Sequence, residues 1–458
     1  MSVPGRSVLL LAAGLGLAAQ LPAWFILKPN RLVNGQGFAL HGLDGSLWWL
    51  LALVWLAAAA SALRPRLLVA APALAAVTTG LTLYAAASGS RLLSVGQQAS
   101  ARVSLGMGFW LALVACYVGW FAATRLAARR SHVVSAALLA GAFVLYLVVS
   151  GQLAGLGLVR ELAAQGADFK AELGRHLALS GTSLLFGVAI GLPAAVAAHR
   201  RPGVATWLLP TVAFFQTVPS LALFGLLLPL LARLGQGLSI GTTLLIGLLL
   251  LPLALLGRAR TPWLRIPIIV LAALPALLWV TVLATVVSGL LTSFLAGSPV
   301  FSGAPTLAAP LGVLGVRGIG AAPALIALIL YSLLPIVRNT YEGLQGVPAA
   351  AVQAGRGMGM SRRQLLTGVE LPLALPVMVA GIRAAAVLVV GITTVAFLIG
   401  AGGLGVFIQR GIDQVVPDLV LLGALPVIAL ALLADGGLRA LGTLLTARPL
   451  RQEGQSGR

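Results

Sequence analysis

The chain contains 458 residues, of which 59% are hydrophobic and 9% charged, and its mean hydropathy is +1.04. Soluble domains carry about 25% charged residues, so this composition excludes a soluble protein and indicates a chain embedded in a membrane. The formal net charge is +20. In a soluble protein, so high a positive charge would indicate binding to nucleic acid. In a membrane protein we expect it to reflect arginines gathered in cytoplasmic loops, so no nucleic acid partner is predicted.

About twelve membrane-spanning helices are predicted, because spans of about 20 apolar residues favour helices over barrel strands. The expected fold class is therefore an all-α integral membrane protein. In chain order the predicted spans are residues 8–27, 46–63, 67–87, 105–123, 133–153, 177–198, 207–232, 238–257, 266–291, 322–337, 373–399 and 419–433. If the N-terminus is cytoplasmic, arginines collect in the inside loops and most acids in the outside loops. We therefore expect both termini in the cytoplasm.

The organisation of the chain changes near residue 165. Residues 1–165 hold five apolar spans without a buried acid or base, and residues 159–176 predict an amphipathic helix on the outer surface. Residues 166–450 are more patterned. There, Gly187 and the glycine four residues later form a GxxxG pair, which favours close helix packing. Residues 451–458 form a short polar tail that we expect in the cytoplasm.

The most patterned polar segment is QAGRGMGMSRRQLLTGVELP, residues 353–372. The residues that lead into it favour a short helix, and the glycines up to Gly359 favour a sharp bend. Ser361 with Gln364 predicts a capping box that starts a second helix, and Pro372 marks the start of the next span. We predict a helix–turn–helix with an apolar face and a basic rim across the cytoplasmic mouth. The alternative is an ordinary positively charged loop.

This segment resembles the EAA loop of binding-protein-dependent ABC importers. That loop has the pattern Glu-Ala-Ala, three residues, Gly, nine residues, a branched apolar residue, one residue and Leu-Pro, and the present chain keeps the spacing. The resemblance implies an ATPase-coupling loop, whose residues are Gln353, Ala354, Gly355, Gly359, Ser361, Arg362, Arg363, Val369, Leu371 and Pro372. Gln353 replaces the usual glutamate and Gly355 the second alanine. The neutral amide keeps hydrogen bonding but loses a charge-assisted contact.

Neighbouring stretches resemble the osmoprotectant permeases for glycine betaine, carnitine and choline. They include RNTYEGLQGV, VELPLALPVMVAGIR, IGAGGLG and FFQTVPSLALFGLLLPLL. The resemblance covers roughly residues 170–412, without about 236–317. It implies a five-helix type I importer permease core within residues 166–450, with the cytoplasmic loop at about 338–372. Residues 236–317 are then a two-span insertion, and the five N-terminal spans are an addition to the core.

The resemblance implies the membrane-spanning subunit of an ATP-driven importer in the bacterial inner membrane, which moves a quaternary ammonium osmoprotectant such as glycine betaine by alternating access. The implied partners are cytoplasmic ATPase subunits, an extracytoplasmic substrate-binding protein, a second permease copy or paralogue, and membrane lipid. ATP is then bound by the partner ATPase, and no cofactor is expected in this chain. Two alternatives stay open: a permease for an amino acid or another small solute, and a twelve-span secondary transporter.

Enzymatic and metal sites are not predicted. Neither Lys28 nor Lys170 follows a glycine, so the chain has no Walker A loop and no catalytic residue is expected. The four histidines lack the spacing of metal ligands.

A translocation path is predicted from polar and aromatic residues inside the spans. Its candidates are Phe215, Gln216, Thr217, Pro219, Ser220 and Arg383. Pro219 predicts a local helix break that turns backbone carbonyls toward a cavity, with ordinary helix packing as the alternative. Arg383 either lines the path or extends to the cytoplasmic face, because a charge in a span is costly and seldom faces lipid.

Overall fold

A computed structural model of the chain describes residues 3–29, 35–98, 101–127, 129–246, 262–297 and 306–445. Within these ranges ten helices are long and apolar enough to cross a membrane, and a shorter apolar helix lies at the N-terminus. The predicted helical membrane fold is thereby confirmed. The expected span 238–257 lies largely outside the described residues, as does the tail 451–458, so a total of about twelve spans stays a prediction.

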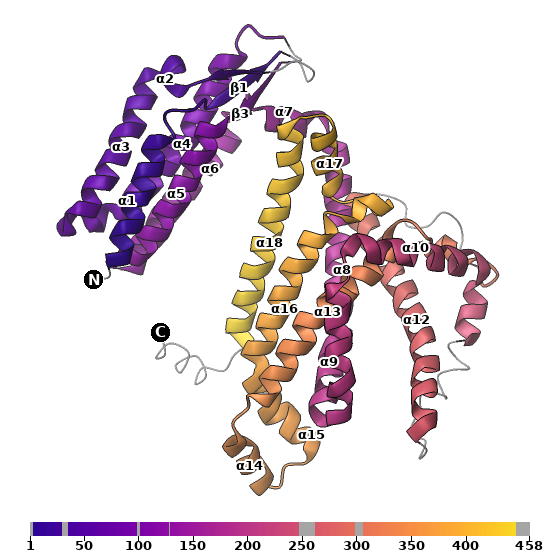
Figure 1. The fold of residues 1–458 in the computed structure, drawn as a ribbon. Helices are drawn as coiled ribbons and strands as arrows, with labels where there is room; N and C mark the ends of the chain where they lie inside the picture. The colour runs from indigo at the N-terminus through magenta and orange to yellow at the C-terminus, as the bar shows by residue number, and fades with distance from the viewer. Residues whose placement is uncertain are drawn as a thin grey trace. The chain divides into compact units, whose positions relative to one another are not determined.

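The chain forms two compact units (Figure 1). Unit 1 comprises Met1–Gly166 with Arg410–Leu422, and unit 2 comprises Ala167–Gln409 with Gly423–Arg458. The elements that lie wholly within unit 1 are α1 (Val3–Ala18), β1 (Phe25–Lys28), β2 (Gln36–Phe38), α2 (Leu40–Leu43), α3 (Gly45–Leu63), η1 (Pro65–Ala70), α4 (Ala71–Ser94), β3 (Arg102–Leu105), α5 (Met107–Leu126), α6 (Arg130–Val149) and α7 (Gly157–Ala164).

The first helix is shorter than the predicted span 8–27. It ends at Ala18, because the residue before Pro22 disfavours the helical conformation. Trp24 is fully buried, and its indole N–H donates to the carbonyl of Ala19 at 2.8 Å, which satisfies an acceptor at the helix end. The chain then enters β1, so the predicted span was wrong in its second half.

A small antiparallel sheet with the strand order β2-β1-β3 was also not predicted. Phe25 of β1 pairs with Phe38 on one side and Leu105 on the other. Strands of three or four residues are too short to show an alternating pattern in the sequence. The fold class is therefore helical with this one sheet within the described residues.

Asp44 starts α3 as an N-cap residue. Its Oδ1 accepts hydrogen bonds from the backbone N–H groups of Ser46 and Leu47, both at 3.1 Å, and from the Ser46 hydroxyl at 2.6 Å. The Ser46 hydroxyl contributes most to holding the pKa of Asp44 below its ordinary value, and the backbone donors act in the same direction. The charged carboxylate is thus the form that caps the helix.

Unit 2 contains most of the remaining helices. Its elements are α8 (Gly166–Arg200), α9 (Pro202–Thr217), α10 (Ser220–Gly237), α12 (Pro262–Ala296), η2 (Leu311–Leu314), α13 (Ala321–Gln345), α14 (Ala349–Gly357), α15 (Arg362–Leu365), the π-helical turn η3 (Leu366–Glu370), α16 (Leu371–Thr393) and η4 (Ala396–Ile399). The helices α17 (Gly405–Asp413) and α18 (Pro417–Leu445) contribute residues to both units.

The amphipathic segment predicted at 159–176 is divided in the structure. Its first part belongs to α7, and its second part is the beginning of α8, which continues without a break to Arg200. A separate surface helix over the whole segment was therefore a wrong prediction. Good helix formers such as Lys170 and Ala171 follow the boundary glycine, so the helix propagates directly into the span.

Glycines allow α8, α13 and α16 to approach closely. A Cβ atom at Gly187 of α8 would overlap the Ser332 hydroxyl of α13, and one at Gly191 would lie 2.8 Å from Ile336 Cγ2. A Cβ atom at Gly381 of α16 would lie 2.6 Å from the Pro335 carbonyl oxygen of α13. The GxxxG pair therefore serves helix packing, as its spacing predicted.

Replacing Gly187 with leucine should separate α8 from α13 and destabilise the protein by about 1–3 kcal/mol, the usual cost of overpacking. Thermal unfolding of the detergent-purified chain measures the effect. Gly181→Leu is the matched control, because a Cβ atom at Gly181 of the same helix meets no atom within 4 Å. Equal melting temperatures of the two variants would contradict the close contact.

Candidate coupling loop and translocation path

The segment between α13 and α16 forms the predicted helix–turn–helix. After α14, the chain reverses at Gly359, whose φ of +79° is a left-handed conformation that side-chain-bearing residues rarely adopt. Ser361 then caps α15: its hydroxyl accepts from the Gln364 N–H at 3.3 Å, and the Gln364 Oε1 accepts from the Ser361 N–H at 2.8 Å. The predicted capping box is confirmed.

A tight contact holds the two arms of this loop together. Gly355 is buried, and a Cβ atom on it would lie 2.7 Å from Leu365 Cδ1 and 3.7 Å from Val369 Cγ2. Leu365 itself is buried. Gly355 thus has a packing reason to replace the alanine of the EAA pattern, because the arms would have to separate to admit a methyl group.

The outer surface of the loop is polar and basic. Gln353, Ala354, Arg362 and Arg363 are all exposed. The loop is also attached to α8, because the Arg200 guanidinium donates to the Arg362 carbonyl at 2.7 Å. An attached loop with an exposed basic rim can transmit a force from a protein bound to it.

The second arm of the loop does not stop before the next span. Pro372 lies in the first turn of α16 as predicted, but α15, the π-helical turn η3 and α16 follow one another without an intervening loop from Arg362 to Thr393. Leu371 and Val369 are half-buried within this run. The sequence showed two separate elements because it does not reveal a π-helical turn that joins them.

The predicted span 207–232 is two helices in the structure. Pro219 follows the end of α9 at Thr217 and lacks an N–H group, so the helical hydrogen bonding stops there. The Tyr331 hydroxyl of α13 donates to the carbonyl of Val218 at the break. The expected break is confirmed, whereas the expectation of one continuous span was wrong.

The residues around this break differ in exposure. Gln216, Thr217 and Pro219 are exposed, while Phe215 and Ser220 are half-buried. The Thr217 hydroxyl donates to the Phe214 carbonyl at 2.8 Å, and the rings of Phe214 and Phe215 lie edge to face with their centroids 5.7 Å apart. The break therefore combines an aromatic pair with polar side chains on one stretch of chain.

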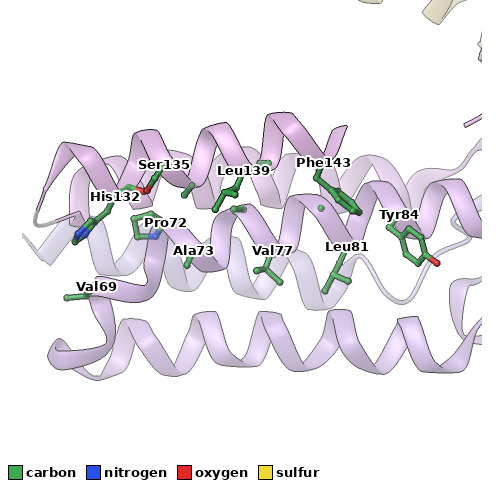
Figure 2. A pocket seen from close by; sticks show the side chains of 14 residues that line it. Val69, Pro72, Ala73, Val77, Leu81, Tyr84, His132, Ser135, Leu139 and Phe143 are labelled. Carbon is green, nitrogen blue, oxygen red and sulfur yellow. The ribbon is translucent and has the colours of Figure 1, made fainter. Parts of the chain in front are cut away.

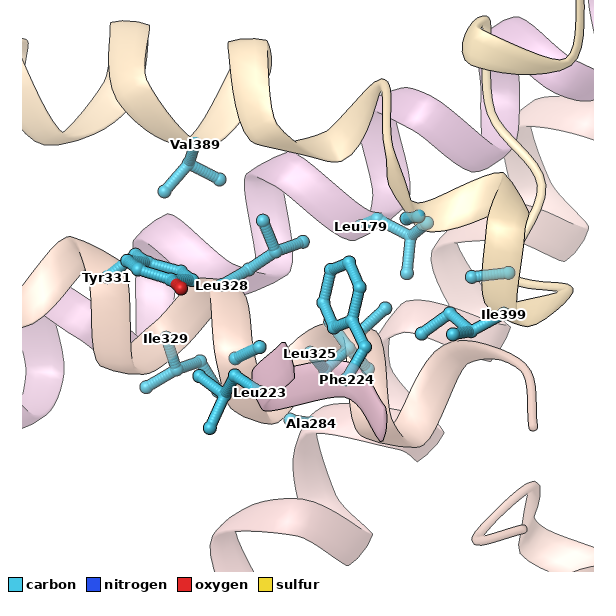
Figure 3. Close-up of a cluster of buried hydrophobic side chains, with 14 residues drawn as sticks. Leu179, Leu223, Phe224, Ala284, Leu325, Leu328, Ile329, Tyr331, Val389 and Ile399 are labelled. Atoms are coloured by element: carbon cyan, nitrogen blue, oxygen red, sulfur yellow. The ribbon is translucent and has the colours of Figure 1, made fainter. Parts of the chain in front are cut away.

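Buried apolar side chains pack beside the break. Figure 3 shows Phe224 of α10 among Leu179, Leu325 and Ile399, with Tyr331 near Leu328. These residues come from helices distant in the sequence. The apolar cluster fixes the position of α10 relative to α13, and it therefore fixes the carbonyl that Tyr331 reaches.

Arg383 pairs with an acid that the sequence placed outside the spans. Its Nε and Nη2 atoms lie 2.8 Å and 2.6 Å from Asp435 Oδ1. Residues 419–433 were the predicted last span, but α18 continues to Leu445 and so contains Asp435. The last helix is therefore longer than the predicted span, and the arginine has its counter-charge within this chain.

Glu172 was not among the predicted site residues. Its carboxylate accepts from the Gly403 N–H at 2.6 Å and from Arg175 at the same distance. Gly402 and Gly403 both have positive φ, and a Cβ atom on Gly402 would lie 2.7 Å from Glu172 Oε2. Glu172 thus fixes the glycine-rich turn before α17, a contact across more than two hundred residues that no local pattern reveals.

Replacing Arg383 with glutamine should leave Asp435 as an uncompensated charge in a span and destabilise the protein, at a cost on the order of 3 kcal/mol. Arg383→Met with Asp435→Leu should restore most of that stability, because both charges are then absent. Thermal unfolding in detergent separates the variants. If Arg383→Gln were as stable as the original chain, water rather than Arg383 would be compensating the charge of the Asp435 carboxylate.

Two family models match the chain. Residues 245–445 match the model described as binding-protein-dependent transport system inner membrane component. Residues 5–159 match the N-terminal domain of the ABC transporter permease YehY. The two family models thus match separate parts of the chain, one N-terminal and one C-terminal.

Three relatives with assigned names illustrate the similarity. The carnitine transport permease protein OpuCB of Listeria monocytogenes is 30% identical over 292 residues, which cover 64% of this chain and 94% of the relative. The osmoprotectant import permease protein OsmW of Salmonella typhimurium is 45% identical over 142 residues, 31% of this chain and 66% of the relative. The glycine betaine/carnitine/choline transport system permease protein OpuCB of Bacillus subtilis is 41% identical over 131 residues, 29% of this chain and 60% of the relative.

Among solved structures, an inward-facing form of the MetNI methionine ABC transporter is similar with a TM-score of 0.36 and 19% identity, over 60% of this chain and 94% of that one. The coverage of the Listeria relative, together with the match to the family model, decides the family. The chain belongs to the binding-protein-dependent transport system inner membrane components, the permease subunits of ABC importers.

Proposed function

We propose that this permease carries a quaternary ammonium osmoprotectant such as glycine betaine into the cell. The observation that supports this substrate class is the set of relatives named for carnitine, choline and glycine betaine transport. The aromatic residues at the α9–α10 break fit such a solute, because a quaternary ammonium group cannot donate hydrogen bonds and is attracted to aromatic faces. Phe215, which is half-buried at the break, is the residue that would offer such a face.

The proposed partners follow from the importer class. Two cytoplasmic ATPase subunits bind and hydrolyse ATP, so this chain performs no catalysis. An extracytoplasmic binding protein delivers the solute, and a second permease copy or a paralogue completes the path. The exposed loop residues Gln353, Ala354, Arg362 and Arg363 form the surface proposed to contact the ATPase, with Gly359 at the turn.

The contacts within the loop support a mechanism of coupling. Closure of the ATPases displaces α14, which presses on Leu365 and Val369 through Gly355. Because α15, η3 and α16 are joined, the displacement moves α16, and the Arg200–Arg362 hydrogen bond moves α8 with it. Rocking of these packed helices opens the path alternately to each side of the membrane.

The proposed orientation has both termini in the cytoplasm. It is supported by the arginines that end α8 and begin α6, which the positive-inside rule places in the cytoplasm. In this orientation the loop at residues 338–372 faces the ATPase. A cysteine introduced at Arg201 should react with a membrane-impermeant reagent only from the cytoplasmic side, and labelling from outside would reverse the assignment.

Uptake into vesicles tests the substrate class. Vesicles that contain the permease, its ATPase and internal ATP, with the binding protein outside, should accumulate a labelled quaternary ammonium solute at least about tenfold faster than methionine, a difference of about 1.4 kcal/mol in activation free energy. Preferential uptake of the amino acid would favour the alternative substrate. Uptake driven by an ion gradient without the ATPase would indicate a secondary transporter.

The same vesicles test the coupling loop. Gly359→Val should lower substrate-stimulated ATP hydrolysis by about tenfold or more, because a branched residue in the left-handed conformation costs about 1–3 kcal/mol and disfavours the turn. Gly357→Val is the matched control: it lies two positions away, has no positive φ, and its Cβ meets no atom within 4 Å. Stimulation at the original rate in Gly359→Val would remove the turn from the coupling mechanism.

A further inference from the structure

An apolar groove runs between α4 and α6 of unit 1 (Figure 2). Its volume is about 720 Å³, and its floor is formed by small residues such as Ala73, Ala76 and Gly80 on α4 and Ala140 on α6. Only 11% of the membrane-spanning part of α6 is buried. This helix therefore presents most of its apolar surface to whatever surrounds the unit.

The polar groups that line the groove are unequally distributed. His132 and Ser135 lie at one end, near Val69, and Tyr84 lies at the other, as Figure 2 shows. The stretch between Pro72 and Tyr84 is helical and extends about 18 Å at 1.5 Å per residue. One leaflet of a bilayer is about 15 Å thick, so the groove is long enough for an acyl chain that crosses a leaflet.

Two basic side chains lie near the His132 end of this groove. Arg66 belongs to η1, which leads to Val69, and Arg130 begins α6 two residues before His132. Both arginines are exposed. No aspartate or glutamate occurs in the sequence between residues 45 and 160, so no acid of these helices offsets this charge.

We propose that the groove binds an anionic phospholipid of the surrounding bilayer. One acyl chain lies between α4 and α6, and the phosphate group contacts Arg66 and Arg130 beside His132. An apolar groove with a cationic end complements an apolar chain with an anionic head, and basic residues at a membrane surface attract anionic lipids. The lipid also covers the side of α4 that α6 leaves open. This site is independent of the transported solute.

Lipid binding to the full-length chain tests the proposal. Detergent-purified protein is titrated with phosphatidylglycerol or with phosphatidylcholine of the same acyl chains, and binding is followed by native mass spectrometry and melting temperature. The original chain should prefer phosphatidylglycerol. Arg66→Gln with Arg130→Gln should weaken phosphatidylglycerol binding roughly 30-fold, the factor for two basic residues at about 1 kcal/mol each.

Three controls separate this site from general charge and from misfolding. Arg66→Lys with Arg130→Lys should bind nearly as the original chain does, and Arg91→Gln, at the other end of α4, should change binding less than about twofold. Ala140→Trp should fill the groove and prevent binding, whereas Ala137→Trp, on the same helix but outside the groove lining, should not.

Several results would overturn the proposal. Equal affinity of the original chain for both lipids would exclude a cationic headgroup site. Equal effects of Ala140→Trp and Ala137→Trp would place the lipid elsewhere. If Ala140→Trp instead converted a dimer to a monomer and left lipid binding unchanged, the groove would belong to a second copy of the chain.

Discussion

The hydrocarbon interior of a membrane offers no hydrogen bonds, and this constraint governs how the chain can end or break a helix. A broken helix exposes backbone carbonyls, each of which needs a donor from the protein. At the end of α1 the indole of Trp24 donates to Ala19, and at the α9–α10 break the hydroxyl of Tyr331 donates to Val218. In both places an aromatic side chain brings a polar tip to the carbonyl and buries its ring in the apolar surroundings.

At the turn before α17, a side chain likewise satisfies a backbone group. There the unsatisfied group is an N–H rather than a carbonyl, and the carboxylate of Glu172 accepts from Gly403. Glycines with positive φ let the backbone approach this carboxylate. In unit 2, the α9–α10 break and the turn before α17 are thus held by side chains from α13 and α8, two helices that approach each other closely at Gly187 and Gly191. These contacts fix the conformation of the non-helical segments.

Close packing supports the proposed coupling between the loop at residues 353–372 and the membrane-spanning helices. Interiors packed at high density transmit displacement, because a side chain has little free volume into which to move. Gly355 joins the two arms of the loop, η3 joins the second arm to α16, and Gly381 joins α16 to α13. The Arg383–Asp435 pair links α16 to α18 in the same way. In the proposed mechanism, a force on α14 would reach several spans through contacts that are already tight.

The sequence by itself determined the features that depend on composition or on neighbours a few residues apart. Low charge and long apolar runs established a helical membrane protein, and the resemblance of residues 353–372 to the EAA loop indicated the importer class. The capping box of Ser361 and Gln364 was predictable because a helix start uses residues three positions apart.

Only the tertiary structure decided which distant groups meet. The sheet around Phe25, the acceptor of Tyr331 and the partner of Arg383 each join segments that chain topology brings together. Hydropathy could not predict these contacts. The hydropathy of a segment reports how apolar it is, but not which other segment packs against it. Long-range pairs depend on how whole helices pack, and that packing is set by the shapes of many side chains at once.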